Sequence, residues 1–171
     1  MIRHSPVRLF LTGGTFDKVH DTRTEGLGFP DDGHSQVPGL LQNARCHFPV
    51  VTQILQMDSL HFTDRERGMI LDAVLSAEET ALVITHGTGT MGMTARFLDD
   101  HVTGKTVVLT GAMRPYSLGR SDAAFNLGGA LIAAQTLGDG VWGVMNGRVF
   151  EARHLEKDVE TGRFDTRSAL H

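Results

Sequence analysis

The sequence predicts an α/β fold, a doubly wound and mainly parallel β-sheet with helices on both faces, in a single domain. Three observations support this prediction. Short apolar, β-rich runs alternate along the chain with segments of helical periodicity. Four of these runs end at loops rich in glycine or hydroxyl residues, as strands do in open α/β sheets. The 171 residues provide one core and no room for a second core of comparable size.

The composition is typical of a globular α/β protein that is rich in loops. The net charge is −4 and the charges are interspersed, so neither nucleic acid nor a membrane surface is expected as a partner. No apolar stretch approaches the length of a membrane span, and the amino terminus leads into the first strand without a signal-peptide core. The single cysteine, Cys46, excludes an internal disulfide and is compatible with a reducing compartment. A cytoplasmic location is therefore expected.

The first strand is expected at residues 7–11, an apolar run that stops at Gly13 and Gly14. Paired glycines allow a ligand to approach the backbone closely. Thr15 follows them at the carboxyl end of the strand, where open α/β sheets bind small molecules. Thr15 is therefore a candidate for chemistry, although the same residues are compatible with an ordinary turn that contains a capping hydroxyl.

The next part of the chain is less regular. Residues 17–38 are polar, contain glycine and proline and have little periodicity, which predicts a long functional loop or lid. A short helix is expected at residues 39–47. The run at 49–55 reads as the second strand, and it ends at residues 56–59.

A capping box marks the start of the following helix. Thr63 provides the cap hydroxyl, Glu66 stands three residues later, and the helix is expected to run to about Ala77. Its apolar face contains Met69, Ile70, Ala73 and Val74. The third strand is expected at residues 81–85, a continuous β-branched run typical of a parallel sheet covered on both faces.

The rest of the chain continues the alternation of strands and helices. A helix is expected at residues 91–101, a fourth strand at 105–110 and its loop at 111–115. Ser121 or Asp122 can cap a long helix that closes at Gly138. The apolar residues of this helix are Phe125, Leu127, Leu131, Ile132 and Leu137. The fifth strand is expected at 141–145, and the pair Asn146-Gly147 predicts a hairpin to residues 148–152.

The loops after the first four strands should open on one edge of the sheet, where they gather hydroxyls, backbone amides and few charges. The chain has no nucleophile elbow, P-loop lysine motif, metalloprotease helix or cysteine spacing for a metal, so no metal is expected. The nine histidines are scattered. His86 is therefore expected to be a structural hydrogen-bonding residue rather than a metal ligand or a base.

One motif favours a different function. Residues 87–92 match the glycine fingerprint of dinucleotide-binding proteins, after a strand and before a helix. The match is weak because it follows the third strand, and because Thr110-Gly111 stands where a ribose-binding acid is expected.

Three motifs occur together at strand ends: Thr-Gly-Gly-Thr-Phe at residues 12–16, His-Gly-Thr-Gly-Thr-Met at 86–91 and Thr-Gly-Ala-Met-Arg-Pro at 110–115. In this order they resemble the bacterial-type L-asparaginases. The resemblance covers nearly the whole chain but only the amino-terminal domain of the usual two-domain members. It implies an amidohydrolase that converts L-asparagine to L-aspartate and ammonia, without a metal or an organic cofactor.

The resemblance also implies roles for individual residues. Thr15 corresponds to the nucleophile, Thr88 to the second catalytic threonine, and Lys157 to the lysine that supports it. A lysine that is desolvated among hydroxyls can relay a proton, and backbone amides can stabilise an oxyanion. Without the resemblance, Lys157 would read as a solvated surface lysine. The implied substrate-binding residues are Gly14, Asp58, Ser59, Gly87 and Gly89.

Three departures from the family pattern limit what the resemblance implies for this chain. Gly89 stands where the family has an acid, and the first loop has no tyrosine where the family keeps a catalytic one. His20, or another loop residue, is a candidate to replace that tyrosine, since the only tyrosine, Tyr116, lies elsewhere. The acid that two-domain members lend to a neighbouring subunit is absent, so a homo-oligomer is expected to complete the site. Two alternatives stay open: an amidase for another small amide, and a non-catalytic sensor that binds a nucleotide or another small molecule.

Overall fold

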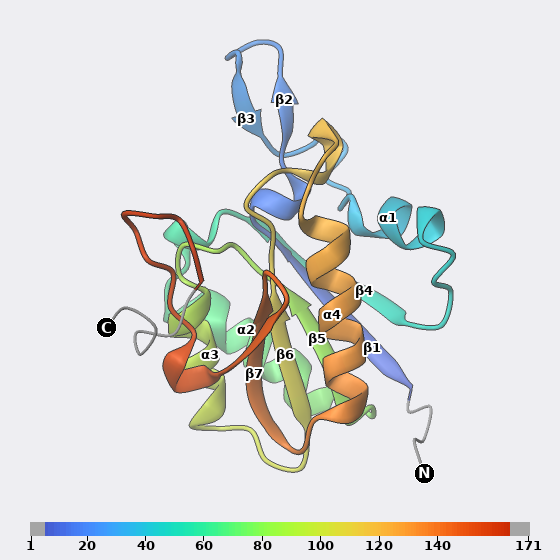
Figure 1. The fold of residues 1–171 in the computed structure, drawn as a ribbon, viewed down its shortest axis with the longest axis vertical. Coiled ribbons are helices and arrows are strands. Elements are labelled where there is room, and N and C mark those ends of the chain that lie inside the picture. Colours follow the sequence, from blue (N-terminus) through green and yellow to red (C-terminus); the bar gives the residue numbers. More distant parts are fainter. Residues whose placement is uncertain (1–5, 165–171) are drawn as a thin grey trace.

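The computed structural model describes residues 6–164 and contains one six-stranded sheet in the order β4-β1-β5-β6-β7-β8 (Figure 1). Its strands are β1 (Val7–Gly13), β4 (Val50–Met57), β5 (Ala81–Thr85), β6 (Thr106–Thr110), β7 (Gly140–Met145) and β8 (Arg148–Glu151). All neighbouring strands are parallel except β7 and β8, which form an antiparallel pair. The predicted α/β class and mainly parallel sheet are confirmed.

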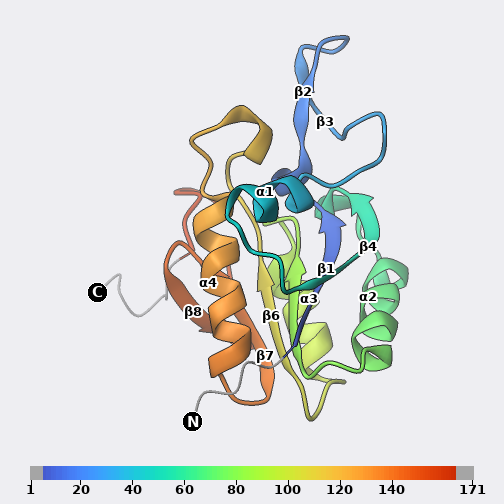
Figure 2. The same ribbon diagram turned by 90° about the vertical axis from the view of Figure 1, so that its right-hand side faces the viewer.

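Two helices cover each face of the sheet. The helices are α1 (Val37–Asn43), α2 (Asp64–Ser76), α3 (Met91–Asp99) and α4 (Ala123–Thr136). Apolar residues of α1 and α4 belong to one core cluster, and those of α2 and α3 to the other. Figure 2 shows α4 and α2 on opposite sides of the sheet. None of these helices is both long enough and apolar enough to cross a lipid bilayer.

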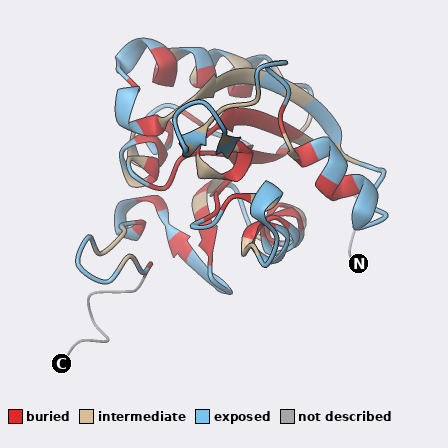
Figure 3. Ribbon diagram, turned by 90° about the horizontal axis from the view of Figure 1, so that it is seen from above, coloured by how far each residue is buried: buried red, intermediate tan, exposed pale blue. Residues whose placement is uncertain are grey.

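The strands divide their side chains between these two cores. In β1, Leu9 and Leu11 pack under α1 and α4, whereas Phe10 packs toward α2 and α3. This alternation follows from the two-residue period of a strand. Figure 3 shows buried residues in the interior strands and on the sheet-facing sides of the helices. A fully buried side chain such as Leu9 contributes roughly 1.5–3 kcal/mol of hydrophobic stabilisation.

The structure contains the capping box and the hairpin turn that the sequence predicts at the ends of helices and strands. Thr63 Oγ1 accepts a hydrogen bond from Arg65 N at 3.2 Å, and Glu66 Oε2 accepts one from Thr63 N at 2.8 Å, so the capping box of α2 is confirmed. The turn at Asn146 and Gly147 joins β7 to β8, and both residues have positive φ, 52° and 80°. Such a pair is favoured in tight hairpins.

The start of α4 differs from the simple cap that the sequence suggests. Ser121 Oγ accepts a hydrogen bond from Ala123 N at 3.0 Å and supports the first turn. Asp122 instead accepts hydrogen bonds from Met113 N and Arg114 N, so its carboxylate fixes the loop after β6. The helix ends at Thr136, two residues before Gly138.

The segment at residues 17–38, predicted as a long functional loop or lid, contains secondary structure that the sequence prediction did not include. The 3₁₀ turn η1 (Thr15–Asp17) leads into an antiparallel hairpin of β2 (Val19–Asp21) and β3 (Gly26–Gly28), which projects from the body of the molecule (Figure 1). Helix α1 also begins two residues earlier than predicted. Proline is tolerated in the first helical turn because its missing N–H has no intrahelical partner there, and Pro38 occupies that turn.

Candidate active site

The loop after β1 approaches the loop after β5 so closely that only glycine fits. Gly14 has φ of 75°, and a Cβ atom built on it would lie 2.5 Å from the Cα atom of Gly87. Gly14 N also donates a hydrogen bond to the Met57 carbonyl at 2.9 Å. Thr15 follows as the first residue of η1 and is half-buried. Gly14 therefore allows the loop that carries Thr15 to lie beside the loop after β5.

Ser59 joins the loop after β4 to the same cluster. A Cβ atom on Gly87 would clash with Ser59 Oγ, so these two loops also touch. Thr90 Oγ1 donates a hydrogen bond to the Ser59 carbonyl at 2.8 Å, and Thr90 N donates a longer one to Ser59 Oγ at 3.4 Å. The structure thus brings together Gly14, Ser59 and Gly87, as their expected place at the carboxyl edge requires.

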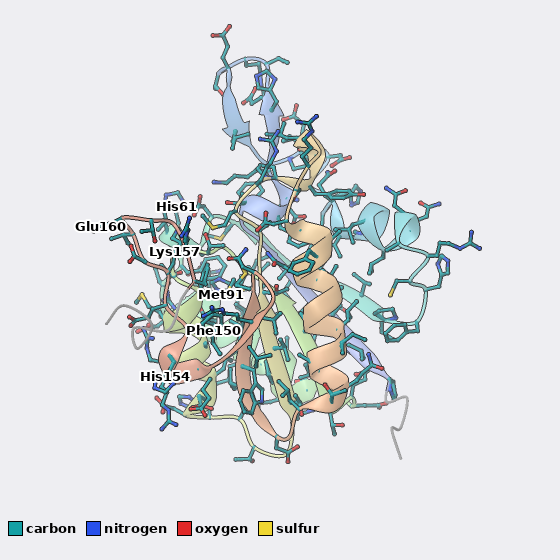
Figure 4. All side chains as sticks on the ribbon, viewed as in Figure 1. His61, Met91, Phe150, His154, Lys157 and Glu160 are labelled. Carbon is teal, nitrogen blue, oxygen red and sulfur yellow. The ribbon has the colours of Figure 1, made fainter. Side chains whose placement is uncertain are left out.

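Lys157 reaches this edge from the carboxyl-terminal segment. Its Nζ donates a hydrogen bond to Thr88 Oγ1 at 3.3 Å, and Thr88 is only 8% exposed. A bridge between Lys157 and Phe164 holds the lysine backbone, and Asp158 caps the intervening turn. Figure 4 labels Lys157 in the segment that follows η4 (Ala152–His154). Lys157 is therefore a half-buried residue in contact with a predicted site threonine.

A second lysine, Lys18, lies at the site and was missed by the sequence prediction. Its Nζ donates a hydrogen bond to Asp58 Oδ2 at 2.6 Å, and Asp58 Oδ1 accepts another from Leu60 N at 3.0 Å. Partial burial raises the pKa of Asp58, but the bonds from Lys18 and Leu60 outweigh it, so the pKa lies below its usual value. Lys18 stands one 3₁₀ turn after Thr15, and its N donates to the Thr15 carbonyl. No local signal in the sequence links Lys18 to Asp58, which lies 40 positions away.

His86 is fully buried at the end of β5 and has a structural hydrogen-bonding role, as expected. Its Nδ1 lies 2.8 Å from the Gly87 carbonyl, so this nitrogen must carry the proton that it donates. Its Nε2 lies 2.8 Å from Thr94 Oγ1 and accepts a hydrogen bond from that hydroxyl. Burial and the charge of Arg67 lower the pKa of His86, whereas the hydrogen bond to the Gly87 carbonyl raises it. Burial has the largest effect, and the pKa is about 4. The imidazole is neutral at physiological pH.

Asp17 fixes the turn that carries Thr15. Its Oδ1 accepts hydrogen bonds from Ser35 Oγ at 2.6 Å and from Gln36 N at 2.9 Å, which join η1 to the residues before α1. Within residues 6–164, its Oδ2 has no hydrogen-bond partner. Burial raises the pKa of this carboxyl above its usual value, against the effect of the two hydrogen bonds.

The structure does not place His20 in contact with the two threonines. His20 is exposed on β2, where it pairs with Leu27 across the hairpin. Among the described residues, its side chain donates no hydrogen bond to Thr15 or Thr88. The hydroxyl of Tyr116 accepts a hydrogen bond from Asn43 Nδ2 at 2.7 Å, and the next residue, Ser117, donates one to the Lys18 carbonyl at 2.8 Å.

Gly89 lies beside the side chain of Leu60 at the edge of the loop. Its φ lies outside the left-handed region, and a Cβ atom would come 2.7 Å from Leu60 Cδ2, the end of a flexible side chain that is 69% exposed. The described residues contain no group of three or more histidine, cysteine or acidic side chains placed to hold a metal ion. The cluster instead offers threonine hydroxyls, a lysine ammonium and glycine-loop amides, which suit nucleophilic attack on a carbonyl carbon.

Comparison with known proteins identifies the family to which these loops correspond. The family model described as "Asparaginase, N-terminal" matches residues 6–169. The chain is 37% identical to the glutaminase-asparaginase of Acinetobacter glutaminasificans, over 63% of this chain and 35% of that protein. It is 32% identical to L-asparaginase 2-3 of Saccharomyces cerevisiae, over 84% of this chain and 42% of the yeast protein.

The fold is also similar to a solved asparaginase structure. L-asparaginase I from Vibrio cholerae superposes with a TM-score of 0.78 at 25% identity, and the match covers 91% of this chain and 49% of that one. The chain therefore spans less than half the length of each of these three relatives.

Proposed function

Because this chain belongs to the asparaginase family and matches its amino-terminal domain, we propose that it is an amidohydrolase that converts L-asparagine to L-aspartate and ammonia. The observation that carries the proposal is the contact between Lys157 and Thr88 at the edge where the Thr15 loop also lies. A lysine beside a buried hydroxyl, next to a second hydroxyl on a glycine loop, is an arrangement suited to proton transfer during acyl transfer.

In the proposed reaction, Thr15 Oγ attacks the side-chain amide carbon of the substrate. The hydroxyl proton passes to the leaving nitrogen, ammonia departs, and an acyl ester forms on Thr15 or a closely related intermediate is reached. Thr88 and Lys157 then assist the attack of water on the acyl group, which regenerates the threonine and releases the carboxylate. Backbone amides of the loops at Gly14 and Gly89 are the proposed donors to the oxyanion.

An ammonia assay over a panel of small amides tests this function. The panel comprises L-asparagine, L-glutamine and amides without an amino group, with the Thr15→Ala variant as the blank. We expect ammonia from at least one amide of a four-carbon acid and none from the blank. A thermal shift with NAD or ATP, without turnover of any amide, would favour the alternative of a nucleotide-binding sensor.

A second copy of the chain is the proposed partner, and the cytoplasm is the proposed location. Contact between copies would rigidify or complete the site, and the large exposed side chains Phe125 and Ile132 on α4, 66% and 62% exposed, offer an apolar surface for it. Light scattering that finds an active monomer at the assay concentration would exclude the oligomer. The free thiol of Cys46 is compatible with a reducing compartment, and cell fractionation tests the location.

A further inference from the structure

The pair formed by Lys18 and Asp58 determines which charges the site offers to a substrate. Lys18 Nζ and Asp58 Oδ2 are 2.6 Å apart, and their side chains are 20% and 24% exposed. The second oxygen of Asp58 accepts the Leu60 amide. Each oxygen of the Asp58 carboxylate therefore has a donor already, and its negative charge is balanced by the ammonium of Lys18.

Several other carboxylates on this side of the described chain also have donors. Asp17 is buried and bonds Ser35 and Gln36, Asp122 bonds the amides of Met113 and Arg114, Asp158 caps its own turn, and Glu156 pairs with Arg96. Position 89 carries no side chain. His61 also faces Asp58 closely enough to lower its pKa when charged. Each of these carboxylates therefore already has at least one donor, and the oxygen of Asp17 without a partner is buried.

The two lysines of the site are each connected to one of the candidate catalytic threonines. Lys157 contacts Thr88, and Lys18 is joined to Thr15 by one 3₁₀ turn. An anionic end of a substrate can therefore bind the ammonium of Lys18, which has three donor hydrogens and uses one of them on Asp58. A positive group at the same place would be repelled by the ammonium of Lys18.

We propose that this site prefers a monoamide of a dicarboxylic acid that has no free α-ammonium, with the distal carboxylate of the substrate bound by Lys18. This inference rests on the proposed amide hydrolysis and names its substrate class. Succinamate is the simplest member, since it is asparagine with the ammonium replaced by hydrogen. One water is consumed, the C–N bond of the amide breaks, and the products are succinate and ammonia.

Steady-state ammonia release from three amides tests the preference. Succinamate carries the carboxylate alone, L-asparagine adds the ammonium, and butyramide carries neither charge. We expect kcat/KM for succinamate to exceed that for L-asparagine by roughly tenfold or more, the effect of one uncompensated charged contact. A tenfold preference for L-asparagine overturns the inference.

Variants separate the role of Lys18 from a structural one. Lys18→Met removes the group that binds the substrate carboxylate and frees Asp58 to bind an ammonium. It should therefore lower the ratio of kcat/KM for succinamate to that for L-asparagine by roughly tenfold or more, through changes in KM. Lys18→Arg should keep the ratio. Arg45→Met, which removes an exposed charge before β4, is the matched control. An unchanged ratio in folded Lys18→Met overturns the inference.

A second measurement keeps this test independent of turnover. If no amide releases ammonia, the proposed function fails, and calorimetry with succinate and L-aspartate then decides the charge preference of the wild-type site. Tighter binding of succinate supports the inference. Equal or tighter binding of L-aspartate, or no binding of either compound, overturns it.

Discussion

Lys157 Nζ lies 3.3 Å from Thr88 Oγ1, although 69 residues separate the two in the chain. Thr88 is buried, and a turn closed by the bridge from Lys157 to Phe164 holds the lysine in place. A proton can move between these two side chains without passing through bulk water. The pair is therefore expected to act as one catalytic unit.

Removal of either member of this pair should have nearly the same effect. We expect Lys157→Met and Thr88→Val each to lower kcat by roughly a hundred- to ten-thousand-fold, the usual range for the loss of acid–base assistance. The double variant should lose little more, because each change already disables the unit. Steady-state kinetics of the three variants provide the double-mutant cycle, and additive losses would show that the residues act separately.

A carboxylate at position 89 should improve binding of L-asparagine. Gly89→Asp adds a negative charge where the substrate ammonium has no free partner, and one charge-assisted hydrogen bond is worth roughly 1.5–3 kcal/mol. We expect KM for L-asparagine to fall by roughly ten- to a hundredfold, with poor activity on L-glutamine in the wild-type protein. The backbone of Gly89 accepts the change, since its φ is not left-handed and only the flexible end of Leu60 must shift.

The matched control for this variant is Gly89→Asn, which has nearly the same shape without the charge. It should leave KM close to the wild-type value. If Gly89→Asp folds and its KM for L-asparagine does not fall, another acid already binds the ammonium and the charge distribution described for this site is incorrect.

The burial of His86 should make stability depend on pH. Its pKa is about 4 in the folded protein and near the usual 6.5 when unfolded, so between these values the unfolded chain binds the extra proton. The contribution of the neutral His86 to the free energy of unfolding is therefore fully present above pH 6.5. It decreases as the pH falls toward 4, by at most roughly 3 kcal/mol. Protonation would also remove the acceptor that Nε2 offers to Thr94.

Urea unfolding at several pH values measures this effect when the wild type is compared with His86→Gln. The difference in unfolding free energy between the two proteins should shrink from pH 7 to pH 4. The comparison cancels the opposing contribution of Asp17, whose raised pKa adds stability at low pH. A difference that stays constant across this range would mean that His86 is not the titrating group.

Much of the fold could be predicted because local signals and tertiary packing agree. The strands β5 and β6 are continuous β-branched runs, and both are fully buried where a parallel sheet is covered on two faces. The capping box at Thr63 and the turn at Asn146 each have a mechanism that acts within a few residues. Such elements need no knowledge of distant parts of the chain.

Features that depend on distant partners were harder to predict. The strands of the β2–β3 hairpin have three residues each and lack an apolar run, so they gave no periodic signal. The ion pair of Lys18 and Asp58 joins residues 40 positions apart, and neither has a neighbour that points to the other. The contact of Lys157 with Thr88 was expected only through the family resemblance, since a lone lysine near the end of a chain reads as a surface residue.

The most direct test of the central claim is the rate of ammonia release by Thr15→Ala, measured on the amide that the wild-type protein hydrolyses best. Thr15 is half-buried in a loop, so the change should leave the fold and melting temperature nearly unaltered. We expect the rate to fall by several orders of magnitude, roughly as for other deleted nucleophiles, and Thr15→Ser to recover part of it. A folded Thr15→Ala variant that retains a tenth of the wild-type rate would contradict the assignment of Thr15 as the nucleophile.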